Sequence, residues 1–262
     1  NHAWGNATFD DLLSALEQAS GRDLSAWADQ WLKTTGINTL SAEFEVEDGR
    51  YASFNVTQAG AAPGAGELRT HRIAVGLYKL VDDKLTRFHR VELDIDGAST
   101  PVSELVGVDK ADFILVNDDD LTYALLGLDE GSPRFVVEHI DKFEDPMPRT
   151  LAWSAAWEMT RSGQMKARDF IALVARGASA ESEIAVLERI LSQAASAVKN
   201  YADPVWAQAE GEDVLATLLL NGAREAAAGS DTQLAFIQAL AKVALNDEAV
   251  TFFRELLDGS VE

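Results

Sequence analysis

The hydrophobic pattern of this chain changes its period near residue 128, and this change restricts the folds that it can adopt. From residue 40 onward apolar and polar residues alternate, as Leu40, Ala42 and Phe44 do with the residues between them. Beyond residue 128 apolar residues recur three and four positions apart, as on one face of a helix. Alternation predicts half-buried strands, and the longer period predicts amphipathic helices. We therefore expect a sheet followed by helices.

Turn signals divide the sheet region into short strands. Asp48-Gly49 is typical of a two-residue hairpin, and a second turn is expected near Asp82-Asp83. A parity switch around His89-Arg90 indicates a β-bulge. The continuous apolar run at 113–116 predicts a strand covered on both faces. Several short strands with turns between them predict a small antiparallel β-sandwich.

The helical region contains short breaks, such as Gly177-Ala178 and Asp203-Pro204, which imply antiparallel neighbouring helices. Because no motif repeats at a fixed period, we predict an irregular α-helical array, or α-superhelix. Its last amphipathic segment ends shortly before Gly259, and we expect further helices to follow in a longer parent chain.

The first 39 residues predict two short amphipathic helices that precede the sheet. Thr8 and Asp11 have the spacing of a capping box at the start of the first helix. In the second helix Trp27 and Trp31 share an apolar face. Because the chain begins apparently inside an element, we expect this face to pack against a core that lies upstream, which predicts an exposed Trp27 or Trp31.

These 39 residues resemble the end of the catalytic domain in the aminopeptidase N family of zinc metallopeptidases (gluzincins), in the form found in actinobacteria. The resemblance rests on the order of Asn6, Asp11, Leu12, Leu13, Ala15, Leu16, Asp23, Leu24, Trp27, Trp31, Leu32 and Gly36. Residues 112–123, DFILVNDDDLTY, resemble the junction of that family into its helical domain. Many members carry an Arg shortly after the aromatic residue, whereas Ala124 follows Tyr123 here, so no role of that Arg is transferred.

The resemblance implies a multidomain α+β fold and a division of labour. Residues 1–39 would be the helical end of the catalytic domain, 40–128 a β-sandwich domain, and 129–262 a C-terminal helical domain that is incomplete. The parent would be a zinc-dependent aminopeptidase that removes N-terminal residues from peptides. This chain would supply the sandwich spacer and a helical bowl over the active site. Its partners would be peptide substrates, through the parent, and the missing upstream catalytic domain.

No catalytic, cofactor-binding or metal-ligating residue is assigned to this chain, and no cofactor is expected in it. The zinc motif of the family needs two His four positions apart with a Glu between them. No pair among His2, His71, His89 and His139 has that spacing. His71 and His89 could face each other across neighbouring strands, but two ligands make a poor zinc site.

Two further patterns bear some likeness to metal sites. Residues 136–139 reverse the His-Glu order of the zinc motif, so we interpret His139 as a partly exposed helix residue. Residues 117–120, Asn-Asp-Asp-Asp, lack the ligand spacing of a calcium loop and read better as a polar turn. The tyrosines occupy no position that matches the family's transition-state Tyr; they are Tyr51, Tyr78, Tyr123 and Tyr201.

Composition excludes several classes of partner. The formal net charge of −21 disfavours binding to nucleic acid or to an anionic membrane. No apolar run approaches the roughly 18 residues that a membrane-spanning helix needs. The absence of Cys fits a reducing compartment, and we expect a cytoplasmic protein.

Two other functions remain open. The chain could be a non-catalytic helical scaffold that binds a protein or peptide partner. The sequence upstream of residue 1 would distinguish the scaffold from the peptidase segment, because the peptidase needs the zinc motif there. A carbohydrate-binding sandwich ranks last, since residues 40–128 contain no Trp on which a sugar could stack.

Overall fold

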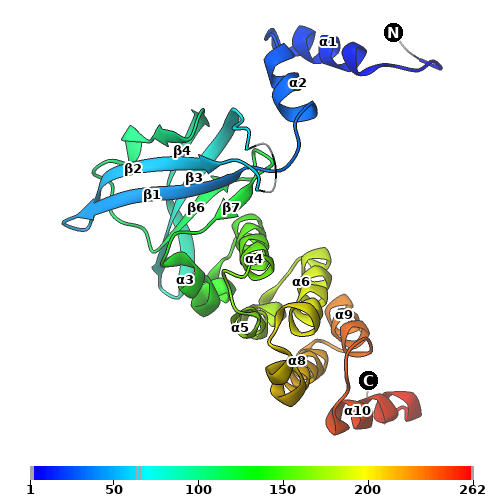
Figure 1. Ribbon diagram of the computed structural model, residues 1–262. Helices are drawn as coiled ribbons and strands as arrows, with labels where there is room; N and C mark the ends of the chain where they lie inside the picture. Colours follow the sequence, from blue (N-terminus) through cyan, green and yellow to red (C-terminus); the bar gives the residue numbers. More distant parts are fainter. Residues whose placement is uncertain (1–2, 63, 65, 261–262) are drawn as a thin grey trace.

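The computed structural model describes residues 3–62, 64 and 66–260. Two helices, α1 (Phe9–Ser20) and α2 (Ser25–Leu32), stand at the N-terminal end and project from the rest of the molecule (Figure 1). The predicted capping box is confirmed, because the Thr8 side chain and the Asp11 side chain each bond the other's backbone N–H. None of the described residues of α1 is buried, and α2 buries Ala28.

Two sheets follow and form a sandwich. The first has the strand order β5-β2-β1-β7. Its strands are β1 (Thr39–Glu47), β2 (Arg50–Ala59), β5 (Ser99–Pro101) and β7 (Leu125–Gly127). The second has the order β4-β3-β6, with β3 (His71–Val81), β4 (Lys84–Ile95) and β6 (Phe113–Asp118). The described strand pairs are antiparallel except β1 and β7, which run parallel, so the sandwich is not purely antiparallel.

The predicted turns and the bulge shape these sheets. Asp48 and Gly49 join β1 to β2 with φ of 49° and 76°, and Asp82 and Asp83 join β3 to β4 with φ of 51° and 64°. Positive φ at both central residues gives the turn a twist that matches the flanking strands. Leu77 pairs with His89 and Tyr78 with Arg87, so the bulged residue is Phe88, next to the predicted position.

The sheet β4-β3-β6 lies between two hydrophobic cores. Its inner face packs against the first sheet through residues that include Ile73, Val75 and Ile114. Its outer face carries Tyr78 and Phe113, which belong to the core of the helical array. All six residues of β6 are buried. The continuous apolar run at 113–116 is therefore explained as predicted, because β6 is buried on both faces.

The helical array extends away from the sandwich as a stack (Figure 1). Its helices are α3 (Ser132–His139), α4 (Pro146–Arg161), α5 (Ala167–Gly177), α6 (Ile184–Ser196), α7 (Pro204–Trp206), α8 (Glu212–Glu225), α9 (Asp231–Leu240) and α10 (Asp247–Asp258). One close approach explains Gly222 on α8: a Cβ there would lie 2.3 Å from the ring of Phe236 on α9. The predicted order of sandwich and helical array is confirmed.

The last helix is held by few contacts. Helix α10 buries Ala249 and Phe252, whereas Leu257 is 88% exposed. No helix in the part of the chain that the structure describes has the length and apolar character needed to cross a membrane.

Candidate functional site

An apolar face on α1 and α2 is left uncovered. Phe9, Leu12 and Leu16 lie on one side of α1 and are 43%, 55% and 41% exposed. Trp27 and Leu32 continue this character on α2, with exposures of 41% and 54%. The expectation of an exposed tryptophan is therefore confirmed for Trp27. Exposed apolar side chains gathered on neighbouring helices make a candidate interaction surface. We call these five residues the N-terminal apolar face.

Where α2 meets the sandwich, a buried arginine binds the helix and the linker after it. Arg69 is 3% exposed. Its Nε donates to the carbonyl of Gln30 at 3.0 Å, and its two terminal nitrogens donate to Asn38 Oδ1 and Thr34 Oγ1, both at 2.6 Å. We call this group the Arg69 junction; its members are Gln30, Trp31, Thr34, Asn38 and Arg69.

The backbone of Arg69 is fastened to the sandwich by one side chain. The Arg69 N–H donates to Gln58 Oε1 at 2.8 Å, and Gln58 Nε2 donates to the Arg69 carbonyl at 3.0 Å. Gln58 lies on β2 and also donates to the carbonyl of Gly97. The guanidinium is thus carried by the sandwich while it binds groups of α2 and its linker.

His71 lies under this junction and corrects one expectation. It pairs with Ile95, whereas His89 pairs with Leu77, so the two histidines do not face each other. His71 is 2% exposed, and its Nδ1 and Nε2 lie 2.8 Å from Thr122 Oγ1 and 3.2 Å from Gln58 Oε1. Burial, and then the charge of Arg69, lower the pKa of His71 to about 4. The ring is therefore neutral at physiological pH.

This lowered pKa predicts a loss of stability in mild acid. The unfolded chain binds a proton at His71 below about pH 6.5, whereas the folded chain resists protonation until about pH 4. The stabilising contribution is therefore present above the unfolded pKa and lost as the pH falls through this window. At about pH 4.5 the free energy of unfolding should therefore be about 2–3 kcal/mol lower than at neutral pH. Urea unfolding at both pH values measures it.

The comparison that isolates His71 uses two variants. His71→Gln should lose less stability than the native chain between the two pH values. Gln238→Ala, at an exposed position on α9 and without a titratable group, should keep the native pH dependence. An equal pH dependence in the native chain and His71→Gln contradicts the assignment.

The polar turn at 117–120 is confirmed as a turn, and its side chains have structural partners. Asn117, Asp119 and Asp120 have positive φ of 61°, 67° and 53°. Asn117 Nδ2 donates to the carbonyl of Thr122, and the Thr122 N–H donates to Asn117 Oδ1. Asn and Asp tolerate this left-handed backbone because their short polar side chains bond locally. Since Thr122 also contacts His71, the turn is connected to the Arg69 junction.

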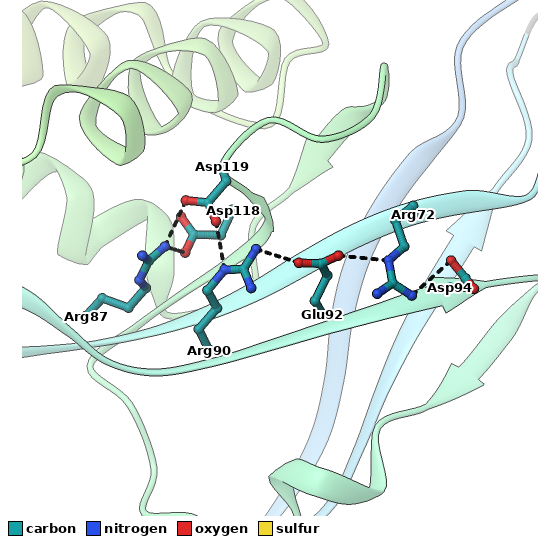
Figure 2. A network of polar contacts seen from close by, with 7 residues as sticks. All are labelled: Arg72, Arg87, Arg90, Glu92, Asp94, Asp118 and Asp119. Atoms are coloured by element: carbon teal, nitrogen blue, oxygen red, sulfur yellow. Dashed lines mark hydrogen bonds and ion pairs between the residues drawn. The ribbon is translucent and has the colours of Figure 1, made fainter. Parts of the chain in front are cut away.

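Asp118 is buried at the end of β6 and starts an ion-pair ladder across β3 and β4. Its Oδ1 accepts from the Tyr78 hydroxyl at 2.8 Å, and its Oδ2 accepts from Arg87 at 2.6 Å. Gly76 makes room for this carboxylate, because a Cβ there would lie 2.2 Å from Asp118 Oδ2. Figure 2 shows the alternating ladder, which comprises Asp118, Arg87, Asp119, Arg90, Glu92, Arg72 and Asp94.

An acidic hollow lies where the chain passes from the sandwich to the array. One cavity of about 590 Å³ is lined by residues of α3, α4 and α5, and a second of about 510 Å³ is lined by the linker before β1, the end of β2, β7 and α4. Both are lined by Met159 and Gln164. Their charged lining residues are Asp129, Glu130, Glu138, Glu158, Asp169 and Arg134. This balance disfavours anionic ligands in the hollow.

The donor groups of the described residues do not fit a zinc site. In residues 3–62, 64 and 66–260 no three His, Cys, Asp or Glu side chains gather closely enough to hold a metal ion. Both ring nitrogens of His71 already have partners, and His139 contacts the ring of Phe135. His2 lies outside the described residues. We therefore derive no chemical step through a metal in this chain.

The sequence interpretation missed the Arg69 junction. One signal was present: Phe54, Val56 and Gln58 share the inward parity of β2, so a polar residue occupies an expected core position. Arg69 itself follows a Gly- and Ala-rich segment without any pattern.

The fold and these surfaces define a class of protein. It is a module built from a β-sandwich and a helical array, with exposed apolar side chains on its N-terminal helices and, among the described residues, no cluster of His, Cys, Asp or Glu that could hold a metal ion. Residues 113–262 match the family model described as the ERAP1-like C-terminal domain, and the chain belongs to that family. The match begins at Phe113 in β6, the strand that is shared by both cores.

The chain is also similar to a curated protein. The protein named aminopeptidase N from Streptomyces lividans is 44% identical over 270 residues, which cover 99% of this chain and 31% of the relative. The chain therefore spans about a third of the length of that relative. The resemblance to the aminopeptidase N family is confirmed. The domain boundaries at 39 and 128 stay predictions.

Proposed function

We propose that this chain is the non-catalytic C-terminal segment of a zinc-dependent aminopeptidase that removes N-terminal residues from peptides. The identity of 44% to a protein named aminopeptidase N, over almost the whole chain, carries the proposal. The catalytic groups and the zinc would belong to the part of the parent that precedes this chain. The peptides would reach this segment through the parent.

On this proposal the three parts have separate tasks. Residues 1–39 complete the catalytic domain, residues 40–128 act as a spacer, and residues 129–262 form a wall over the active site. The N-terminal apolar face supports the first task, because Phe9, Leu12 and Trp27 need a partner that buries them. The acidic hollow supports the third, since it suits peptides with a cationic N-terminus better than anionic ligands. We further propose a cytoplasmic location, which the absence of Cys supports.

The proposal predicts a sharp difference between this chain and its parent. The isolated chain, purified free of host peptidases, should hold no stoichiometric zinc and should release no product from an aminoacyl reporter. The parent protein should hold zinc and should release product from the reporter. Zinc catalysis needs three protein ligands and a general base, which this chain does not bring together. Metal analysis and a fluorogenic assay measure the two properties. Metal-dependent release by the isolated chain would place the chemistry here and overturn the proposal.

The alternative is a scaffold that binds a partner protein through the same helices. Reading the open reading frame upstream of residue 1 decides between the two. A parent without a His-Glu-x-x-His motif and a later Glu favours the scaffold.

A further inference from the structure

We propose that Arg69 is a positioning residue, which fixes the angle of the α1–α2 pair on the sandwich and thereby the placement of the helical wall relative to the catalytic domain. The part that concerns the catalytic domain rests on the proposed function. The part that concerns α2 rests on the contacts of this chain alone.

The first argument is the kind of partners that Arg69 has. Buried arginines are normally matched by a carboxylate, because an unpaired charge is costly to remove from water. None of the ion pairs among the described residues includes Arg69. Its guanidinium instead donates to the neutral oxygens of Gln30, Thr34 and Asn38 and lies 5.3 Å from the ring centroid of Trp31. Because these partners all lie on α2 and the linker after it, the buried guanidinium attaches that segment to the sandwich.

The second argument is that little else holds α2. Among the described residues, α1 has no buried side chain and α2 has Ala28. Further contacts reach the sandwich at the same place: the Thr70 N–H donates to Gln30 Oε1 at 3.2 Å, and Trp31 meets the His71 ring edge-on at 5.1 Å. Both flank Arg69. The guanidinium fork is rigid and planar, so its three directions of bonding define an orientation as well as an attachment.

The third argument is the position of the junction in the fold. Asn38 accepts from Arg69 through its side chain, and its carbonyl accepts from the N–H of Leu125, the first residue of β7. Strand β7 then leads the chain into the helical array. The same few residues therefore meet the end of α2, the start of β1 and the way into the array. A change of angle here moves the N-terminal helices relative to the wall.

The first test measures the attachment of α2 in this chain. Lys33 lies in the linker next to the junction, so a lysine-specific protease reports its release. Arg69→Met should accelerate cleavage after Lys33 by about tenfold, because local release exposes the linker. Thr34→Val, which removes one acceptor, should accelerate it by about threefold. Arg72→Met, on the exposed ion-pair ladder of β3 and three positions after Arg69, is the matched control and should leave the rate unchanged.

Two outcomes overturn the attachment. One is an unchanged rate after Lys33 in both Arg69→Met and Thr34→Val. The other is an equal acceleration after Lys33 and after Lys79 of β3 in both variants, because that reports general unfolding.

The second test uses the complete parent protein. Arg69→Met should change kcat/KM for a peptide of about ten residues by at least about fivefold, since the helical wall is displaced, and should leave a short aminoacyl reporter within about twofold. A simple loss of stability lowers both activities together, and that result overturns the positioning role. A parent that cleaves neither substrate refutes the proposed function, while the protease test still decides whether Arg69 holds α2.

Discussion

Replacing Glu181 by alanine should lower the free energy of unfolding of the helical array by about 3–5 kcal/mol. Glu181 lies in the turn before α6, and its side chain is fully buried against Arg149 of α4. Two parallel hydrogen bonds join them, from Arg149 Nε at 3.0 Å and from a terminal nitrogen at 2.8 Å. Trp153 Nε1 donates to the same carboxylate at 3.1 Å. Removal leaves a buried guanidinium and an indole N–H without this acceptor.

The pH dependence gives this prediction a second signature. Burial acts to raise the pKa of Glu181, but the hydrogen bonds from Arg149 and from the Glu183 N–H outweigh it and hold the pKa below its ordinary value. A carboxyl with a lowered pKa stabilises the fold above its unfolded pKa, and this contribution is lost as the pH falls through the folded value. The difference between the native chain and Glu181→Ala should therefore shrink on acidification.

Two controls make the Glu181 measurement specific. Glu158→Ala removes a partly exposed partner of Arg161 on the same helix α4, and it should cost at most about 1 kcal/mol. The double variant Arg149→Met/Glu181→Leu should recover much of the loss, because an apolar pair needs no desolvation of charge. Urea unfolding followed by far-ultraviolet circular dichroism reports the array. A loss below about 1 kcal/mol in Glu181→Ala contradicts the prediction.

Asp118 and Asp119 provide a second large effect with a control one residue away. Both carboxylates bind Arg87, at 2.6 Å and 2.9 Å. The side chain of Asp118 is fully buried and accepts from the buried Tyr78 hydroxyl, whereas that of Asp119 is 37% exposed. Asp118→Ala should cost about 2–3 kcal/mol, since the Tyr78 hydroxyl loses its acceptor inside the core. Asp119→Ala should cost at most about 1 kcal/mol.

Thermal and urea unfolding of the two alanine variants measure this contrast. Burial and the nearby charge of Asp118 raise the pKa of Tyr78, so its hydroxyl stays protonated and able to donate. The double variant Asp118→Ala/Tyr78→Phe should be less destabilised than Asp118→Ala, because it removes the donor left without an acceptor. Equal losses in the two single variants would show that burial of the carboxylate does not matter here.

The sequence was sufficient for the order of elements because hydrophobic period reports burial directly. The alternation around Leu40 and Phe44 and the helical spacing after residue 128 placed strands and helices correctly. The apolar run of β6 even indicated cover on both faces. The same reasoning could not reveal the parallel pairing of β1 with β7, since Leu125–Gly127 is too short to show a period.

The junction was not predictable for a different reason. Arg69 donates hydrogen bonds to Gln30, Thr34 and Asn38, which lie about 30 to 40 positions away along the chain. No local pattern encodes a bond of that separation. The histidine pairing failed because the turn at Asp82 and Asp83 sets the register of β3 with β4, which keeps His71 and His89 apart; the bulge at Phe88 shifts that register by one position. Register depends on the whole sheet, so a sequence pattern gives it only approximately.

The parallel pairing of β1 with β7 also bears on the order of folding. Among the described strands of the sandwich, β1 is the first to be synthesised and its neighbour β7 is the last. Contacts between distant segments form slowly, because the intervening chain must first lose its freedom. During synthesis that edge of β1 stays open until residues 125–127 have emerged. The first sheet should therefore be completed only when the first helices of the array are being synthesised. The folding of the sandwich is thus coupled to the synthesis of the array.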